Sequence, residues 1–414
     1  MSSGQRLRRV WSWIVAPWLL GGSFAFLGCS GEGPDAGPSF DGGPFGSAGS
    51  SAGSGSPEAG AGGQAGAAGA ASGGSGGVRE GNGGSLGWSG SGGASVAGSG
   101  GGGGAAPVGR VGAESCPAGP FGDPLPANPS IQKLASVGGN DNVNWEGLVW
   151  VGNALFFSEI AGNNSSQINR FVPGGSVQRG AFPNTGSNGL ALDPSGDLLL
   201  AAHDVGGISR LDLPAGTLTR GAQTFNGMRF NSPNDLVLRA DGNLYFTDPD
   251  FQSPSGRIQG DTRVYRIAPA QGGQPGAISV VDDSIDQPNG ITLSPDGNTL
   301  YVTGGSVLRS YALDAAGVAT PIKAFQQALQ VPDGMAMDCA GNVYAVENSA
   351  RRIRVFSADG TLLGTIGPQG FDNQGLTNVA FGGTNHTTLF VSSFTQGSQG
   401  GLYSVELNVP GLPY

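Results

Sequence analysis

The sequence predicts an all-β fold: a six-bladed β-propeller preceded by a Gly/Ala/Ser-rich segment that we expect to be disordered. Three observations carry this prediction. A hairpin-like unit recurs six times, successive copies begin 42 to 55 residues apart, and short apolar runs within each copy are separated by Gly-containing turns. A parallel sheet would need long helical periods between its strands, and the sequence has none.

The first apolar run marks the start of each copy. These runs begin, in chain order, at Glu146, Asn188, Asn234, Asn289, Asp333 and Thr377. The spacings are therefore 42, 46, 55, 44 and 44 residues, a regularity typical of a repeat architecture. A second run follows each first one and reads LFFSE, LLLAAH, LYFTD, LYVTG, VYAVE and LFVSS in turn. A third run follows in every copy, which gives the strand content of a propeller blade.

Outer fourth strands are indicated at 176–178, 217–219, 278–281 and 361–363. The sixth copy has no room for one, because the chain ends soon after Val405. We expect residues 130–135, which precede the first copy, to fill that place and close the ring.

Residues 1–29 have the features of an export signal, with a basic start, an apolar run over 10–27 and Cys29 after Gly28. The position of Cys29 resembles a bacterial lipoprotein processing site, which implies lipidation of that residue. We therefore expect an extracytoplasmic protein held by its lipid to a bacterial membrane, with the outer membrane or cell surface favoured by Ser30. An uncleaved anchor and a secreted or periplasmic protein are the alternatives.

Residues 30–115 are dominated by Gly, Ala and Ser and carry no periodic apolar pattern. Such a segment buries too little surface to offset its ordering entropy, so it is predicted to be a flexible linker. As a Gly-rich coil it would span about 50 Å between its ends.

Residues 116–414 are the predicted propeller. The formal net charge of −10, with 12% charged residues, disfavours nucleic-acid binding, which needs a basic face. With Cys29 assigned to lipid, Cys116 and Cys339 remain, and they form either a disulfide or two buried thiols. A closed ring exposes few strand edges, so we expect a monomer.

The six first residues converge on the propeller axis, since first strands line the central channel. Carboxylates and amide carbonyls are hard oxygen ligands, and this set suits Ca²⁺. Asn and Asp also cap turns, which is the alternative for any single position. Glu146 does not fit that alternative, because Glu has little turn preference.

The stretches WEGLVW, SPNDLVLRADGNLYFTDPDF, QPNGITLSPDGNTLYVT and VPDGMAMDCAGNVYAVE resemble the gluconolactonase/regucalcin (senescence marker protein, SMP-30) family over about residues 140–407. The resemblance implies a divalent metal, Ca²⁺ or another such as Zn²⁺, Mg²⁺ or Mn²⁺. The implied ligands are Glu146, Asn234, Asn289 and Asp333.

Four further residues are candidates. Asp235, next to a candidate ligand, corresponds to an acidic residue at the metal in relatives and is a possible base; a capped turn is its alternative. His203 follows the blade-two strand and resembles a family His, although Ala202 stands where Glu is usual; it could carry a proton, bind substrate or only pack. Asn188 and Thr377 are predicted to contact substrate.

The resemblance implies a hydrolase that opens a lactone, a small-molecule cyclic ester, by metal polarisation of the carbonyl and attack of water. No G-x-S-x-G nucleophile elbow is suitably placed, so a covalent acyl route is unsupported. A phosphotriesterase-like activity at the same metal, and a tethered propeller that binds a ligand or protein without turnover, are the alternatives.

Overall fold

The computed structural model describes residues 116–137, 141–271 and 274–412. Every regular element in this part of the chain is a β-strand, as the all-β prediction requires. Nor do the described residues contain a helix with the length and hydropathy needed to cross a bilayer. The predicted signal, Cys29 and the whole predicted linker (30–115) lie outside the described residues.

The strands pair as antiparallel units of four. The first unit is β2 (Asn142–Val151), β3 (Ala154–Ala161), β4 (Ser166–Phe171) and β5 (Val177–Phe182); the second is β6 (Ser187–Leu192), β7 (Leu198–Ala202), β8 (Gly207–Leu211) and β9 (Leu218–Arg220). The third is β12 (Leu236–Leu238), β13 (Leu244–Asp248), β14 (Arg263–Ile267) and β15 (Ile278–Asp282); the fourth is β16 (Pro288–Leu293), β17 (Thr299–Gly304), β18 (Val307–Leu313) and β19 (Ala319–Ala328). The fifth is β20 (Pro332–Met337), β21 (Val343–Glu347), β22 (Arg352–Phe356) and β23 (Leu362–Ile366).

The sixth unit uses both ends of the described chain. It consists of β24 (Leu376–Gly382), β25 (Thr388–Gln396), β26 (Gln399–Glu406) and β1 (Ile131–Ala135). Strand β1 pairs antiparallel with β26, with Ile131 opposite Val405, so the predicted closing strand is confirmed. The sixth unit is also joined to the first, because β2 pairs with β25. A separate hairpin, β10 (Thr224–Phe225) and β11 (Met228–Arg229), precedes the third unit and was not predicted.

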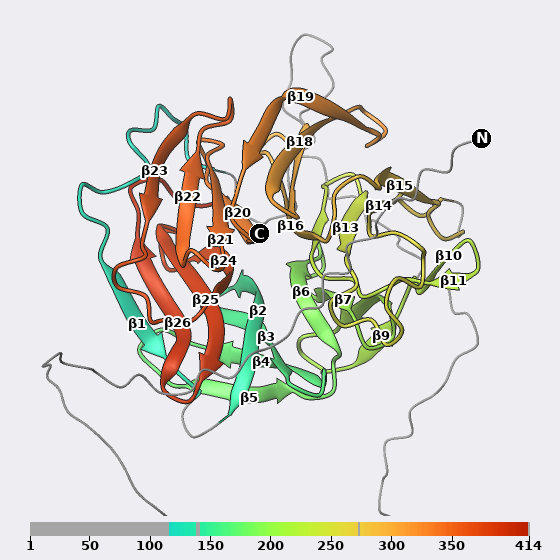
Figure 1. Ribbon diagram of the computed structural model, residues 1–414, viewed down its shortest axis with the longest axis horizontal. Helices are drawn as coiled ribbons and strands as arrows, with labels where there is room; N and C mark the ends of the chain where they lie inside the picture. Colours follow the sequence, from blue (N-terminus) through green and yellow to red (C-terminus); the bar gives the residue numbers. More distant parts are fainter. Residues whose placement is uncertain (1–115, 138–140, 272–273, 413–414) are drawn as a thin grey trace, which may run out of the picture. The chain divides into compact units, whose positions relative to one another are not determined.

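The six first strands contact one another in a closed cycle, β2 to β6, β12, β16, β20, β24 and back to β2. Figure 1 shows the labelled members of this set around a common centre, with the other strands of each unit farther out. This arrangement is that of a β-propeller, and the four-stranded pairing is consistent with six blades.

The hydrophobic core lies between the blades. Each of six buried apolar clusters draws its side chains from two adjacent blades. Between blades two and three, for example, Leu199 and Ile208 join Phe230, Phe246 and Tyr265. The ring of Phe230 contacts those of Phe246 and Tyr265 at 5.0 Å between centroids. Both faces of a blade therefore carry apolar side chains, which explains the near-continuous apolar runs in the sequence.

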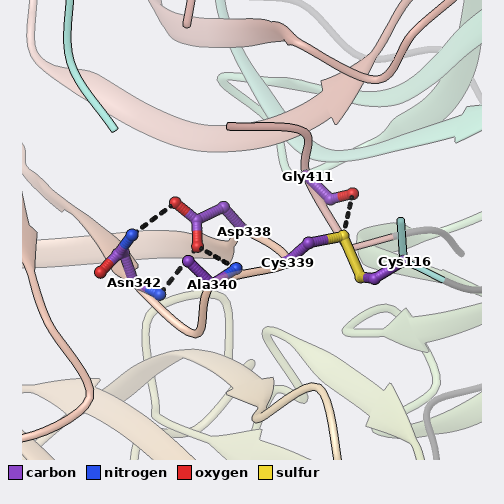
Figure 2. Close-up of a disulfide and its surroundings, with 6 residues drawn as sticks. All are labelled: Cys116, Asp338, Cys339, Ala340, Asn342 and Gly411. Atoms are coloured by element: carbon purple, nitrogen blue, oxygen red, sulfur yellow. Dashed lines mark hydrogen bonds between the residues drawn. A yellow bond between two sulfur atoms is a disulfide. The ribbon is translucent and has the colours of Figure 1, made fainter. Parts of the chain in front are cut away.

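Cys116 and Cys339 form a disulfide, with their Cα atoms 5.5 Å apart and 223 positions apart in sequence. Figure 2 shows the bridge beside Gly411 and the turn that follows Asp338. The Asp338 carboxylate accepts hydrogen bonds from the backbone N–H groups of Ala340 and Asn342, both at 2.9 Å. The bridge thus ties the segment before β1 to an ordered turn of blade five.

Candidate metal centre and active site

The candidate ligands belong to the first-strand segments of four blades: Asn289 and Asp333 are the second residues of β16 and β20, Asn234 lies just before β12, and Glu146 lies in the middle of β2. Glu146, Asn234, Asn289 and Asp333 are all buried. A Cβ atom at Gly147 would lie 2.0 Å from the carbonyl oxygen of Asn188, and one at Gly290 would lie 2.6 Å from that of Asp333. Glycine after these candidate ligands therefore allows the backbones of neighbouring blades to approach closely.

The carboxylates of the two acidic candidate ligands, Glu146 and Asp333, lie in an unfavourable electrostatic environment. Burial raises the pKa of Glu146 well above its usual range, and the carboxylates of Asp333 and Asp235 raise it further. Burial also raises the pKa of Asp333, and the charge of Asp235 adds to this effect. Three acidic groups thus act on one another in a buried space, which a bound cation would stabilise.

Side-chain amides surround the two carboxylates. Asn144 donates to Glu146 Oε1 (3.0 Å), and Asn378 also donates to that carboxylate. Asn348 donates to Asp333 Oδ2 (3.1 Å). Sequence reasoning missed these three Asn residues. The sequence did carry a signal for two of them. Asn348 directly follows Glu347, the last residue of β21, and Asn378 directly follows Thr377, one of the six repeat-start residues.

The donor set fits a hard divalent cation. Asp333 Oδ1 is buried and has no hydrogen-bond partner among the described residues. The described part of the chain contains no cluster of three or more His, Cys, Asp or Glu side chains that could hold a metal ion without other ligands. The candidate set instead takes half of its ligands from Asn, and mixed carboxylate and amide oxygens are the ligands that Ca²⁺ accepts.

A set of hydroxyl groups fixes the backbone of the candidate ligands. Thr247 Oγ1 accepts the N–H of Asp235 (3.0 Å) and donates to the carbonyl of Asn289 (2.6 Å). Thr303 Oγ1 likewise accepts the N–H of Gly290 (2.8 Å) and donates to the carbonyl of Asp333 (2.7 Å). Each hydroxyl joins its own blade to the ligand residue of the next blade.

The sequence contained a signal for these hydroxyls. Ser or Thr is the next-to-last residue of four second-strand runs, LFFSE, LYFTD, LYVTG and LFVSS. In blade six, Ser392 Oγ lies 2.8 Å from the hydroxyl of Thr377, which donates to the carbonyl of Trp145 at 2.5 Å. The Thr377 hydroxyl therefore joins blade six to blade one, next to Glu146, which is a different role from the predicted substrate contact.

Asp235 is held by two strands. Its Oδ1 accepts the N–H of Leu236 (2.9 Å), and its Oδ2 accepts the N–H of Ile291 in the next blade (3.2 Å). The Asp235 carboxylate thus accepts backbone N–H groups, as the side chain of a turn-capping residue does. Its charge also acts on Glu146 and Asp333, so it belongs to the candidate centre.

His203 is buried in a different environment. Its Nε2 donates to the carbonyl of Asn164 (3.0 Å), and its Nδ1 has no partner among the described residues. Burial lowers the pKa of this imidazole, and the charged groups that act on it are Asp204, Arg229 and Arg220. The charged groups that act most strongly on His203 are therefore these three residues.

Asn188 is fully buried at the start of β6, and its Nδ2 has no hydrogen-bond partner among the described residues. An unpaired buried amide is costly, so a bound molecule that accepts its N–H would be stabilised there. The substrate contact predicted for Asn188 stays a prediction.

Comparisons with known proteins agree with the fold and the motifs. Residues 145–395 match the family described as "SMP-30/Gluconolactonase/LRE-like region". A gluconolactonase from Zymomonas mobilis is 31% identical over 301 residues, which cover 65% of this chain and 80% of the relative. The pentonolactonase XacC of Haloferax volcanii is 27% identical over 162 residues, 36% of this chain and 52% of that relative.

Among solved structures, a gluconolactonase from Xanthomonas campestris superposes with a TM-score of 0.55 at 24% identity, covering 70% of this chain and 99% of the other; at that identity it supports the fold alone. The match of the family to most of the propeller, together with the relative from Zymomonas mobilis, shows that the chain belongs to the SMP-30/gluconolactonase/LRE-like family of lactone hydrolases.

Proposed function

We propose that the protein is a calcium-dependent lactonase whose metal is held by Glu146, Asn234, Asn289 and Asp333. The observation that carries this proposal is the pair of buried, mutually repelling carboxylates, Glu146 and Asp333, with Asp333 Oδ1 unpartnered among the described residues. A buried acidic pair is unfavourable by itself and favourable around a cation. The gluconolactonase and pentonolactonase among its relatives support a lactone as the substrate.

When bound, the divalent cation supplies Lewis acidity that polarises an ester carbonyl. The protein supplies the remaining functions. Asn188 offers its free amide N–H groups to the substrate's oxygen atoms. Asp235 is our candidate for accepting the proton of the attacking water, because its charge acts on both ligand carboxylates while its backbone contacts hold it in place. His203 is the weaker candidate, since its electrostatic neighbours are other residues.

The direct test is hydrolysis of glucono-δ-lactone by the full chain, followed with a pH indicator after treatment with EDTA and after reloading with Ca²⁺, Mg²⁺, Mn²⁺ or Zn²⁺. We expect the rate to fall at least 100-fold on stripping and to return best with Ca²⁺. Glu146→Gln should remain inactive in every metal, while Glu406→Gln, a change at an exposed strand end, should keep the native rate. A stripped enzyme that retains its full rate would contradict the proposal.

We also propose that Cys29 is lipidated and holds the propeller outside the cytoplasm. The support is the order of basic start, apolar run and Cys in the sequence. Mass spectrometry of the protein from its native membrane fraction should find a diacylated N-terminal Cys29. A mature chain that begins elsewhere, or that retains residues 1–28, would disprove this proposal.

A further inference from the structure

Two arginines fill the space between blades three and four. Arg239 is fully buried, and its Nη1 donates to the carbonyl of Asp314 (2.9 Å). Arg266 donates from Nε to Asn243 Oδ1 (2.7 Å) and from Nη2 to the carbonyl of Ala316. Both guanidinium groups thus bind the turn that joins the third and fourth strands of blade four.

Serines occupy the equivalent positions one blade further along. The blade-three segment LVLRADGN corresponds to ITLSPDGN in blade four, which places Ser294 where Arg239 stands. Strand pairing gives the second equivalence, because Arg266 lies opposite Tyr245 in blade three and Ser310 lies opposite Tyr301 in blade four. The junction between blades four and five therefore lacks both arginine side chains.

A cavity of about 500 Å³ lies at this junction. Its lining includes Ser294, Ser310, Tyr301, Ile322, Asp296 and Asp359. Ser310 is 2% exposed, and its hydroxyl has no hydrogen-bond partner in the part of the chain that the structure describes. A buried hydroxyl without a partner is unfavourable, and a ligand that bonds to it would remove this cost.

We call the contact between blades three and four the first junction and the contact between blades four and five the second junction. The hydrogen-bond acceptors that bind the arginines at the first junction have counterparts at the second. The turn Asp314–Gly317 corresponds to Ser357–Gly360, since each is closed by the N–H of its Gly bonding to the first residue's carbonyl. Asp359 therefore takes the place of Ala316 and adds a carboxylate. Asp296 corresponds to Asp241, which pairs with Arg239 at 3.6 Å. The second junction thus keeps acidic and carbonyl acceptors but has lost the cations.

We propose that this cavity binds an organic cation: a guanidinium group carried on a short alkyl chain, as in an arginine side chain or a small alkylguanidine. Tyr301 and Ile322 provide apolar contact for the alkyl part, Ser310 provides a buried hydroxyl, and the Asp296 and Asp359 carboxylates bind the cation. The cavity lies at the end of β16 that leads into Ser294, whereas the candidate metal centre lies at the other end of that strand, so the two sites are separate.

The test is calorimetric titration of the full chain with n-butylguanidinium chloride, with the neutral isostere n-butylurea as the chemical control. We expect one site with millimolar or tighter affinity for the cation and no measurable heat for the urea. Ser310→Arg places an arginine where blade three has one, and it should weaken binding at least tenfold while the circular dichroism spectrum stays unchanged.

Asp359→Asn tests the same site without a change in the core, because Asp359 is exposed. It should weaken binding at least threefold, whereas Asp261→Asn, a matched change at an exposed residue of blade three, should leave it unaltered. If Ser310→Arg does not fold, Asp359→Asn decides the question. The proposal is overturned if the native protein gives no heat up to 10 mM, if n-butylurea binds equally well, or if Asp359→Asn and Asp261→Asn behave alike.

Discussion

Replacing Thr303 with Val tests whether the inter-blade hydroxyls hold the candidate metal ligands. Thr303 is fully buried, and its hydroxyl satisfies both the N–H of Gly290 and the carbonyl of Asp333. Val has nearly the same shape but leaves both backbone groups without this partner. Each buried group left unsatisfied costs about 1–3 kcal/mol, so unfolding should become easier by about 2–6 kcal/mol. For a domain of this size that corresponds to a fall in melting temperature of about 3–10 °C.

The chain offers a matched control in Thr292, another buried Thr of blade four, whose hydroxyl has no partner among the described residues. Thr292→Val should therefore be neutral or stabilising, and Thr303→Ser should restore most of the lost stability. Melting should be followed by circular dichroism, with the calcium dissociation constant measured on the same samples. Because Thr303 holds the backbone of Asp333, we expect weaker calcium binding only in Thr303→Val. Equal effects of the two Val substitutions on stability and on calcium binding would refute the reasoning.

Three further predictions concern other parts of the fold. Burial raises the pKa of Asp248 to about 7, so between pH 4 and pH 7 the folded state holds more protons than the unfolded state. The free energy of unfolding should therefore fall by about 4 kcal/mol as the pH rises from 4 to 7 and then level off. Urea titrations at several pH values should show that the free energy of unfolding of Asp248→Asn depends less on pH. Cys339→Ser removes a disulfide that joins residues 223 positions apart, and the chain-entropy model sets the resulting loss of stability at up to about 5 kcal/mol. Calorimetry should show a lower melting temperature for this variant, and the native protein in reducing agent should melt at the same temperature as the variant. An unchanged melting temperature would show that the disulfide contributes nothing to stability. Gly290→Ala places a Cβ atom 2.6 Å from the carbonyl oxygen of Asp333, so it should weaken calcium binding at least tenfold in fluorescence titrations. Native calcium affinity in this variant would show that calcium binding does not require the close approach of blades four and five.

The repeat pattern predicted most of the fold because propeller blades carry local signals. Gly-containing turns and apolar runs mark each hairpin, and the missing fourth strand of the last copy pointed to residues 130–135 as the closing strand. The hairpin β10–β11 was missed, because its two-residue strands are too short to give an apolar pattern.

The candidate site was predicted only in part. Equivalent repeat positions identified Glu146 and Asp333, since repetition places them at one end of the ring. The amides that bond to these carboxylates could not be found this way, because Asn144 lies two residues before Glu146, while Asn348 lies in the turn after β21 and Asp333 lies in β20. Nor could the sequence show that Arg220 and Arg229 act on His203 together with the adjacent Asp204, since that depends on how β9 and the β10–β11 hairpin pack around the end of β7.

The central claim is that Glu146, Asn234, Asn289 and Asp333 form one cation site. The most direct measurement is calorimetric titration of the EDTA-treated full chain with CaCl₂, for the native protein beside Asp333→Asn, a change that keeps the shape of the side chain and removes its charge. The account predicts one bound Ca²⁺ per native chain and at least 100-fold weaker binding in the variant. The account would be contradicted if Ca²⁺ does not bind to the native protein, or if it binds equally well to Asp333→Asn.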